Sequence, residues 1–77
     1  MYKVYILRNR ETNELYYEYT DNIGRRLLEH NKKQNCWEII YYEAYKSEID
    51  ARTREKRLKQ YAQALTVLKG RLKNSLK

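Results

Sequence analysis

Two short apolar segments near the start of the chain are separated by only six polar residues. Residues 2–8 (YKVYILR) and 15–20 (LYYEYT) are rich in aromatic and β-branched residues, which favour strands, and residues 9–14 (NRETNE) are turn-prone. A parallel pair of strands needs a crossover of about a dozen residues or more, so this short connection favours an antiparallel hairpin. The fold is therefore expected to be built on an antiparallel sheet.

The middle of the chain predicts a helix followed by a third strand. Thr20 or Asp21 can cap a helix that ends near Asn31, and the residue types over 37–43 (WEIIYYE) favour a strand. The polar residues 31–35 (NKKQN) between them predict a loop. This part of the chain thus adds one helix and one strand to the hairpin.

Two more helices are predicted towards the end. Ser47 followed by Asp50 is typical of a capping box, so a long helix is expected over about 48–61. Leucines spaced three and four residues apart predict a final helix, and they lie at positions 65, 68, 72 and 76. We expect an α/β (α+β) fold, a small three-stranded, mainly antiparallel sheet flanked by helices, in the order β-β-α-β-α-α.

The chain is 77 residues long, so residues 1–77 are expected to form a single small domain. A domain of this size has little room for a deep closed cavity, and no small-molecule cofactor is expected. No segment approaches the roughly 18 consecutive apolar residues of a membrane helix, and the first residues lack the apolar run of a signal peptide. The sequence therefore predicts a cytoplasmic protein without a membrane partner.

The positive charge of the chain is concentrated in its last third. Residues 51–77 contain nine basic residues and one acidic residue, Glu55, whereas residues 1–50 contain eight basic and nine acidic residues. A concentrated positive field attracts polyanions, and nucleic acid is the commonest polyanion inside the cell. A solubilising surface is the alternative explanation of the same charge.

Two tyrosines are predicted to share one face of the sheet. Side chains alternate along a strand, so the register that buries Val4 and Ile6 together places Tyr5 and Tyr16 on the opposite face. A phenol can donate or accept a hydrogen bond, orient water, or take part in proton transfer. Because the chain has nine tyrosines and no phenylalanine, the alternative is that most of these rings are structural.

The first predicted helix carries two side chains that could act on a phosphate. Arg26 and His30 are four residues apart and so lie on one face of the helix. The arginine fork suits bidentate phosphate recognition, and a histidine beside it can orient a partner or transfer a proton. The alternatives are a surface ion pair between Arg26 and Glu29, and an interaction of His30 with the helix dipole.

Glu55 lies on the predicted inward face of its helix. Ala51, Glu55, Leu58 and Ala62 follow one another at spacings of four, three and four residues. A buried glutamate needs a partner, and Mg²⁺ is often held by one or two carboxylates together with water and phosphate oxygens. An ion pair with Lys59, one helical turn further on, is the alternative partner.

Together these residues resemble the GIY-YIG nuclease superfamily, in particular its small single-domain members. Residues 4–6 (VYI) match the first motif, and residues 15–20 (LYYEYT) lie where the family commonly has LYIGYT. Residues 21–31 (DNIGRRLLEHN) resemble the family helix with its arginine. Residues 51–59 (ARTREKRLK) resemble the segment that carries the metal-binding glutamate. The resemblance covers nearly the whole chain.

The resemblance implies a metal-dependent DNA endonuclease that hydrolyses phosphodiester bonds by a one-metal mechanism, with Mg²⁺ or Mn²⁺ bound at Glu55. The implied catalytic residues are Tyr5, Tyr16, Arg26, His30 and Glu55. The tyrosines would position and deprotonate the attacking water, and Arg26 would neutralise the phosphate. We assign contacts with nucleic acid to Lys3, Arg25, Arg52, Lys56 and Lys59. The expected partner is DNA, including branched or damaged DNA, and the expected process is DNA repair or recombination.

The sequence departs from the family in its second motif and in one loop. The glycine of the motif is Glu18 here and its isoleucine is Tyr17. A glutamate at this position could crowd the site and place a negative charge near an incoming phosphate, or it could provide a second metal ligand. The loop before Trp37 is shorter than in the small members. A catalytically degenerate nucleic-acid-binding module on the same fold is therefore the main alternative, and a scaffold or protein-binding domain is a third hypothesis.

Overall fold

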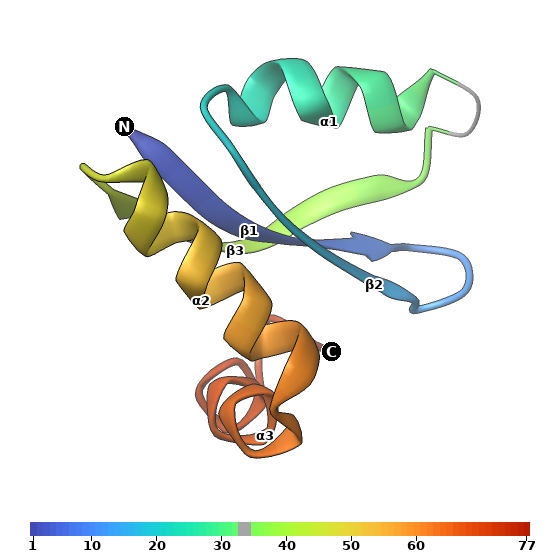
Figure 1. The fold of residues 1–77 in the computed structure, drawn as a ribbon. Coiled ribbons are helices and arrows are strands. Elements are labelled where there is room, and N and C mark those ends of the chain that lie inside the picture. The colour runs from blue at the N-terminus through green and yellow to red at the C-terminus, as the bar shows by residue number, and fades with distance from the viewer. Residues whose placement is uncertain (33–34) are drawn as a thin grey trace.

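The computed structural model of the chain describes residues 1–32 and 35–77. The predicted polar loop over 31–35 lies partly outside these residues. The elements are β1 (Tyr2–Asn9), β2 (Leu15–Thr20), α1 (Ile23–Asn31), β3 (Trp37–Tyr45), α2 (Glu48–Gln60) and α3 (Ala62–Arg71) (Figure 1). The predicted element order and the predicted α+β fold are confirmed. In the described part of the chain, no helix combines the length and the apolar character needed to cross a bilayer.

The three strands form one antiparallel sheet with β1 in the centre, in the order β2-β1-β3. Val4 lies opposite Tyr19 and Tyr5 lies opposite Glu18, so the predicted division of side chains between the two faces is confirmed. The pairing of β1 with β3 shifts between Ile6 and Leu7. Such an irregularity increases the local twist of the sheet.

Both faces of the central strand are covered by helices. Four consecutive residues of β1, from Val4 to Leu7, are at most 1% exposed, although adjacent side chains of a strand point to opposite faces. The α1 helix lies on one side of the sheet, and α2 and α3 lie on the other (Figure 1). The sheet is therefore a middle layer, and a residue of β1 or β2 can face either helical layer.

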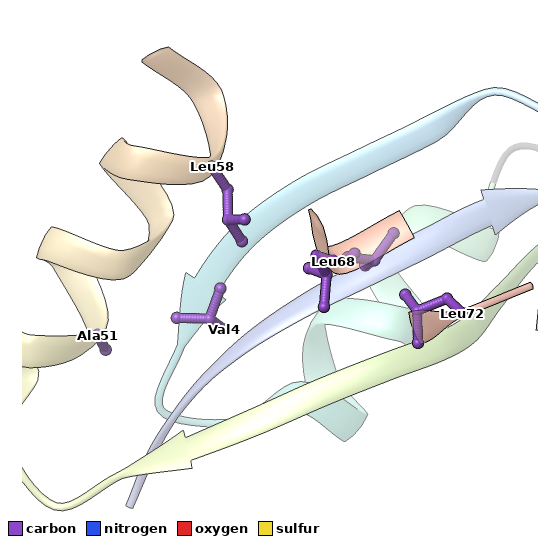
Figure 2. Packing of buried hydrophobic residues seen from close by; sticks show 6 residues of the cluster. Val4, Ala51, Leu58, Leu68 and Leu72 are labelled. Carbon is purple, nitrogen blue, oxygen red and sulfur yellow. The ribbon is translucent and has the colours of Figure 1, made fainter. Parts of the chain in front are cut away.

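The hydrophobic core lies between the sheet and the pair α2 and α3. Its buried side chains point toward one another from β1, α2 and the end of the chain (Figure 2), and they are Val4, Ile6, Ala51, Leu58, Leu68 and Leu72. The predicted inward stripe of α2 is correct up to Leu58 but wrong at Ala62, which is exposed. The reason is that Tyr61 has an extended backbone (φ −114°, ψ 101°), so α2 ends and Ala62 begins a new helix.

Two predicted helix caps differ from the observed ones. Asn22, rather than Thr20 or Asp21, caps α1, and its side-chain oxygen accepts the backbone N–H of Arg25 at 3.0 Å. Ser47 occupies the cap position of α2, but its side chain makes no capping hydrogen bond, so the predicted capping box is wrong. The final helix also ends at Arg71, which leaves Leu72 in the core just beyond it.

Candidate active site

Four of the five predicted catalytic residues gather on the sheet face that α1 covers. The rings of Tyr16 and His30 meet edge to face, with centroids 4.5 Å apart and an interplanar angle of 63°. Tyr5 is fully buried, and the charge of Arg26 acts on its hydroxyl. The α1 cluster, defined as Tyr5, Tyr16, Arg26 and His30, therefore combines two phenols, a guanidinium and an imidazole.

The α1 cluster contains buried polar atoms without a hydrogen-bond partner. Within residues 1–32 and 35–77, the buried side-chain atoms that lack one are Tyr5 Oη, Arg26 Nε and His30 Nε2. Buried polar groups are normally hydrogen-bonded, and each exception calls for an explanation. All three exceptions belong to predicted catalytic residues. This pattern is typical of a site whose hydrogen-bonding capacity is reserved for a ligand.

Glu18 occupies the centre of the α1 cluster. Its carboxylate accepts a short hydrogen bond from the Tyr16 hydroxyl and lies 3.1 Å from Arg26 Nη2. The side chains of Arg26 and Glu18 are 27% and 28% exposed, so this ion pair is only partly screened by water. The other terminal nitrogen of Arg26 pairs with Glu29, the partner that the sequence offered as an alternative. A phosphate that approaches the terminal nitrogens of Arg26 therefore competes with these carboxylates.

Both phenols of the α1 cluster are protonated at neutral pH. Burial, followed by the hydrogen bond to Glu18 and the negative charge of Glu18, raises the pKa of Tyr16 to about 12. Burial also raises the pKa of Tyr5, and the neighbouring Arg26 offsets only part of this effect. Both hydroxyls are thus hydrogen-bond donors at rest, and proton abstraction by either one requires nearby positive charge.

His30 is predicted to make the stability of the protein depend on pH. Burial, and then the positive charge of Arg26, hold its pKa below the ordinary value of 6.5. The unfolded chain therefore takes up this proton at a higher pH than the folded protein. The contribution of neutral His30 to the free energy of unfolding is therefore complete above about pH 6.5. It is lost as the pH falls through the pKa that His30 has in the folded protein.

Chemical denaturation of the native protein and of a His30→Gln variant at about pH 7.5 and about pH 5.5 measures this effect. We expect the native protein to lose more unfolding free energy over this interval than the variant. The carboxylate of Glu43 does not interfere, because hydrogen bonds from Tyr41, Tyr45 and Arg54 outweigh its burial and keep its pKa below 4.5. Equal losses in the two proteins would contradict the assignment.

Trp37 and Asn31 support the α1 cluster and were not predicted to do so. The Trp37 ring lies 6.0 Å from His30 and 6.4 Å from Tyr16, measured between centroids. The Asn31 side chain accepts the backbone N–H of Trp37 at 2.9 Å and donates to its carbonyl at 3.1 Å. These bonds tie the end of α1 to the start of β3. No sequence pattern marks such a pair, because it depends on how the chain folds back after α1.

Glu55 reaches the free edge of β2 from the opposite side of the sheet. Its Oε2 accepts the backbone N–H of Tyr19 at 2.8 Å, and its Oε1 lies 3.8 Å from Lys59 Nζ. The side chain is 19% exposed, so the predicted inward orientation and the alternative ion pair are both present. Because Tyr19 follows Glu18 in β2, Glu55 and the α1 cluster approach neighbouring residues of this strand from two sides.

Two surface hollows meet at Tyr19. One, of about 450 Å³, is lined by Glu55 and by three of the predicted nucleic-acid contacts, Arg52, Lys56 and Lys59. The other, of about 460 Å³, is lined by Glu18 and by two arginines of α1, Arg25 and Arg26. Lys3, opposite Thr20 in the register, is outside both linings. The structure thus brings together four of the five predicted nucleic-acid contacts.

Glu55 is the side chain best placed to hold a divalent metal ion. Among the described residues, no three His, Cys, Asp or Glu side chains form a metal-binding group. Mg²⁺ and Mn²⁺ prefer hard oxygen ligands, and Mg²⁺ is often bound through one carboxylate with water and phosphate oxygens. The Glu55 carboxylate fits this role because it keeps lone pairs beyond its bond to Tyr19. Glu18 fits a metal-ligand role less well, since Arg26 and Tyr16 engage its carboxylate.

Comparison with known protein families gives a match over most of the chain. The chain matches the model of the GIY-YIG catalytic domain over residues 1–69, which include every predicted site residue. No curated protein and no solved structure matches the chain. Because the matched segment covers most of the 77 residues, the chain belongs to the GIY-YIG family of catalytic domains.

Proposed function

We propose that this protein is a metal-dependent endonuclease that hydrolyses phosphodiester bonds in DNA by a one-metal mechanism. Membership of the GIY-YIG family supports nuclease activity on a nucleic acid. The observation that supports these particular residues best is the set of three unsatisfied polar atoms in the α1 cluster. Tyr5 and Arg26 interact with each other, and the three atoms keep hydrogen-bonding capacity for a ligand beside a strand edge reached by Glu55.

Each residue of the site has a distinct role in this proposal. Arg26 binds the scissile phosphate through its guanidinium fork after Glu18 moves aside. Tyr16 orients the attacking water, because Tyr5 is fully buried and instead interacts with Arg26. Tyr16 is protonated at rest, so it accepts the water's proton only after it has released its own proton to solvent under the positive charge of Arg26. His30 is neutral and holds the Tyr16 ring through their edge contact. A divalent ion at Glu55 would supply positive charge to the phosphate and to the leaving oxygen.

A nucleic-acid-binding module without catalytic activity is the second candidate function. The specific observation in its favour is Glu18, whose carboxylate occupies both Arg26 and Tyr16. If the phosphate cannot displace Glu18, the positive residues around Glu55 still attract the nucleic acid, but the reacting groups stay occupied. This module would bind DNA with an affinity that falls as the salt concentration rises, and it would not cut it.

A nicking assay separates the two functions. Supercoiled plasmid and branched DNA are incubated with the purified protein and Mg²⁺ or Mn²⁺, and the cut products are resolved on gels. We expect cleavage that stops when a chelator removes the metal and resumes when the metal is restored. Salt-sensitive binding without cleavage under all of these conditions would support the non-catalytic module and contradict the endonuclease.

A further inference from the structure

A third hollow is lined by residues of α2, of α3 and of the Tyr61 junction between them. It has a volume of about 450 Å³, and its polar lining consists of Arg54, Arg57, Tyr61, Gln63 and Arg71. Leu68 also lines this hollow and belongs to the hydrophobic core. The helices α2 and α3 lie on the side of the sheet away from α1 (Figure 1). None of its lining residues belongs to the α1 cluster or to the two hollows beside Tyr19. This arginine hollow is therefore a separate feature of the molecule.

The arginine hollow carries more positive charge than its surroundings neutralise. Arg54 donates its Nε–H to Glu43 at 2.6 Å, and Glu43 also accepts hydrogen bonds from Tyr41 and Tyr45. Over residues 1–32 and 35–77, neither Arg57 nor Arg71 forms an ion pair. Arg54 is thus held in place by a carboxylate, and the positive charges of Arg57 and Arg71 remain for an external anion. Planar guanidinium groups in such a set suit phosphate oxygens.

An exposed aromatic ring stands at the rim of the arginine hollow. Tyr61 joins α2 to α3 in an extended conformation, and it is 60% exposed. Proteins that bind single-stranded nucleic acid without sequence preference combine a positive groove along the backbone with aromatic rings on which unpaired bases stack. A duplex offers no such base, because its bases are already stacked within the helix. The combination of Arg57, Arg71 and Tyr61 therefore suits an unpaired strand better than a duplex.

We propose that the arginine hollow binds single-stranded nucleic acid, with phosphates on Arg54, Arg57 and Arg71 and a base stacked on Tyr61. This site goes beyond the proposed endonuclease, since it lies across the sheet from the α1 cluster and holds nucleotides that are not cut. A protein with two such sites would engage a duplex or junction at one and an unpaired segment at the other. DNA with single-stranded branches is the substrate that offers both.

Binding of a fluorescently labelled single strand, measured by anisotropy in the presence of a chelator, tests this site without any contribution from cleavage. The slope of log affinity against log salt concentration should decrease by about 0.7 for Arg57→Gln and for Arg71→Gln. Lys46→Gln is the matched control, because Lys46 is exposed and lies before α2, at the end far from the arginine hollow. We expect its slope to equal that of the native protein.

Replacement of the aromatic ring gives the second measurement. Tyr61→Leu should weaken binding of the single strand by between about 5-fold and about 150-fold, whereas Tyr61→Phe should retain it, because the stacking face is preserved. Binding of a duplex of the same sequence should change little in either variant. All of these side chains are exposed, so the fold should survive, and circular dichroism checks it.

The proposal is overturned if both arginine variants behave like Lys46→Gln, or if Tyr61→Leu weakens single-strand and duplex binding equally. It is also overturned if an acidic peptide competes for Arg57 and Arg71 more strongly than the strand does. Failure here would leave cleavage at the α1 cluster unaffected. Absence of cleavage in the nicking assay would, conversely, leave the binding measurements valid.

Discussion

Replacing Glu55 by Gln, or Arg26 by Gln, lowers the rate of DNA cleavage by about 10²- to 10³-fold in the proposed mechanism. Arg26→Gln removes a positive charge that acts on the phosphate as negative charge develops in the transition state, and Glu55→Gln removes the anionic ligand for the metal ion that would supply the other positive charge. The Gln at position 55 can still accept the Tyr19 N–H, so the α2–β2 contact is kept while the anionic metal ligand is lost. The loss should therefore appear in the cleavage rate with little change in folding.

Rates of plasmid nicking at saturating metal measure these effects. Glu11→Gln is the matched control for Glu55→Gln, since Glu11 is an exposed acid in the loop between β1 and β2. Arg26→Lys tests whether the two-pronged guanidinium geometry is needed, because lysine keeps the positive charge but presents it at a single nitrogen. Cleavage that persists at the native rate in both Gln variants would exclude this mechanism.

Replacing Glu18 by Gly or by Gln raises cleavage by roughly tenfold. The carboxylate that competes with phosphate for Arg26 is removed, and a partly exposed charged hydrogen bond contributes about 1 to 2 kcal/mol. Either change removes the negative charge of Glu18, and Glu18→Gly also removes its hydrogen bond, so the pKa of Tyr16 should fall while burial remains the largest cause that raises it. Glu18→Gly restores the residue of the family motif, whereas Glu18→Gln removes the charge and keeps a strand-compatible side chain.

Two readouts distinguish the outcomes for Glu18. Nicking rates show whether the site becomes more active, and ultraviolet titration of the phenols shows whether the pKa of Tyr16 falls from about 12. Cleavage by the Glu18 variants alone would identify the natural protein as a catalytically degenerate module. A slower rate in both variants would instead contradict the competing role and make Glu18 part of the catalytic machinery.

The shared face of Tyr5 and Tyr16 was predictable from sequence, because it depends only on alternation along short strands. The antiparallel register confirms that Tyr5 and Tyr16 share a face, and the spacing of Arg26 and His30 places both on one side of α1. Alternation along a strand and four-residue spacing along a helix predict the observed faces because β1, β2 and α1 are regular at these residues.

Other parts of the site depend on which of several adjacent residues takes a given role, or on backbone atoms that are distant in the sequence. The periodicity of a sequence reports neither. Thr20, Asp21 and Asn22 are three adjacent residues that can all cap a helix, and the path of the chain after β2 decides among them. The partner of Glu55 is a backbone N–H, which no residue type reveals. The contacts of Glu18 depend on which rotamer reaches both Arg26 and Tyr16, and Ala62 leaves the α2 stripe because the backbone turns at Tyr61.

The amide that Glu55 binds is the peptide bond between Glu18 and Tyr19. This planar peptide unit therefore connects Glu55, the proposed metal ligand, to Glu18, whose carboxylate pairs with Arg26. Its position is set by the pairing of β2 with β1. Insertions or deletions between β1 and β2, or between α1 and β3, should consequently leave the spacing of the two halves of the site unchanged.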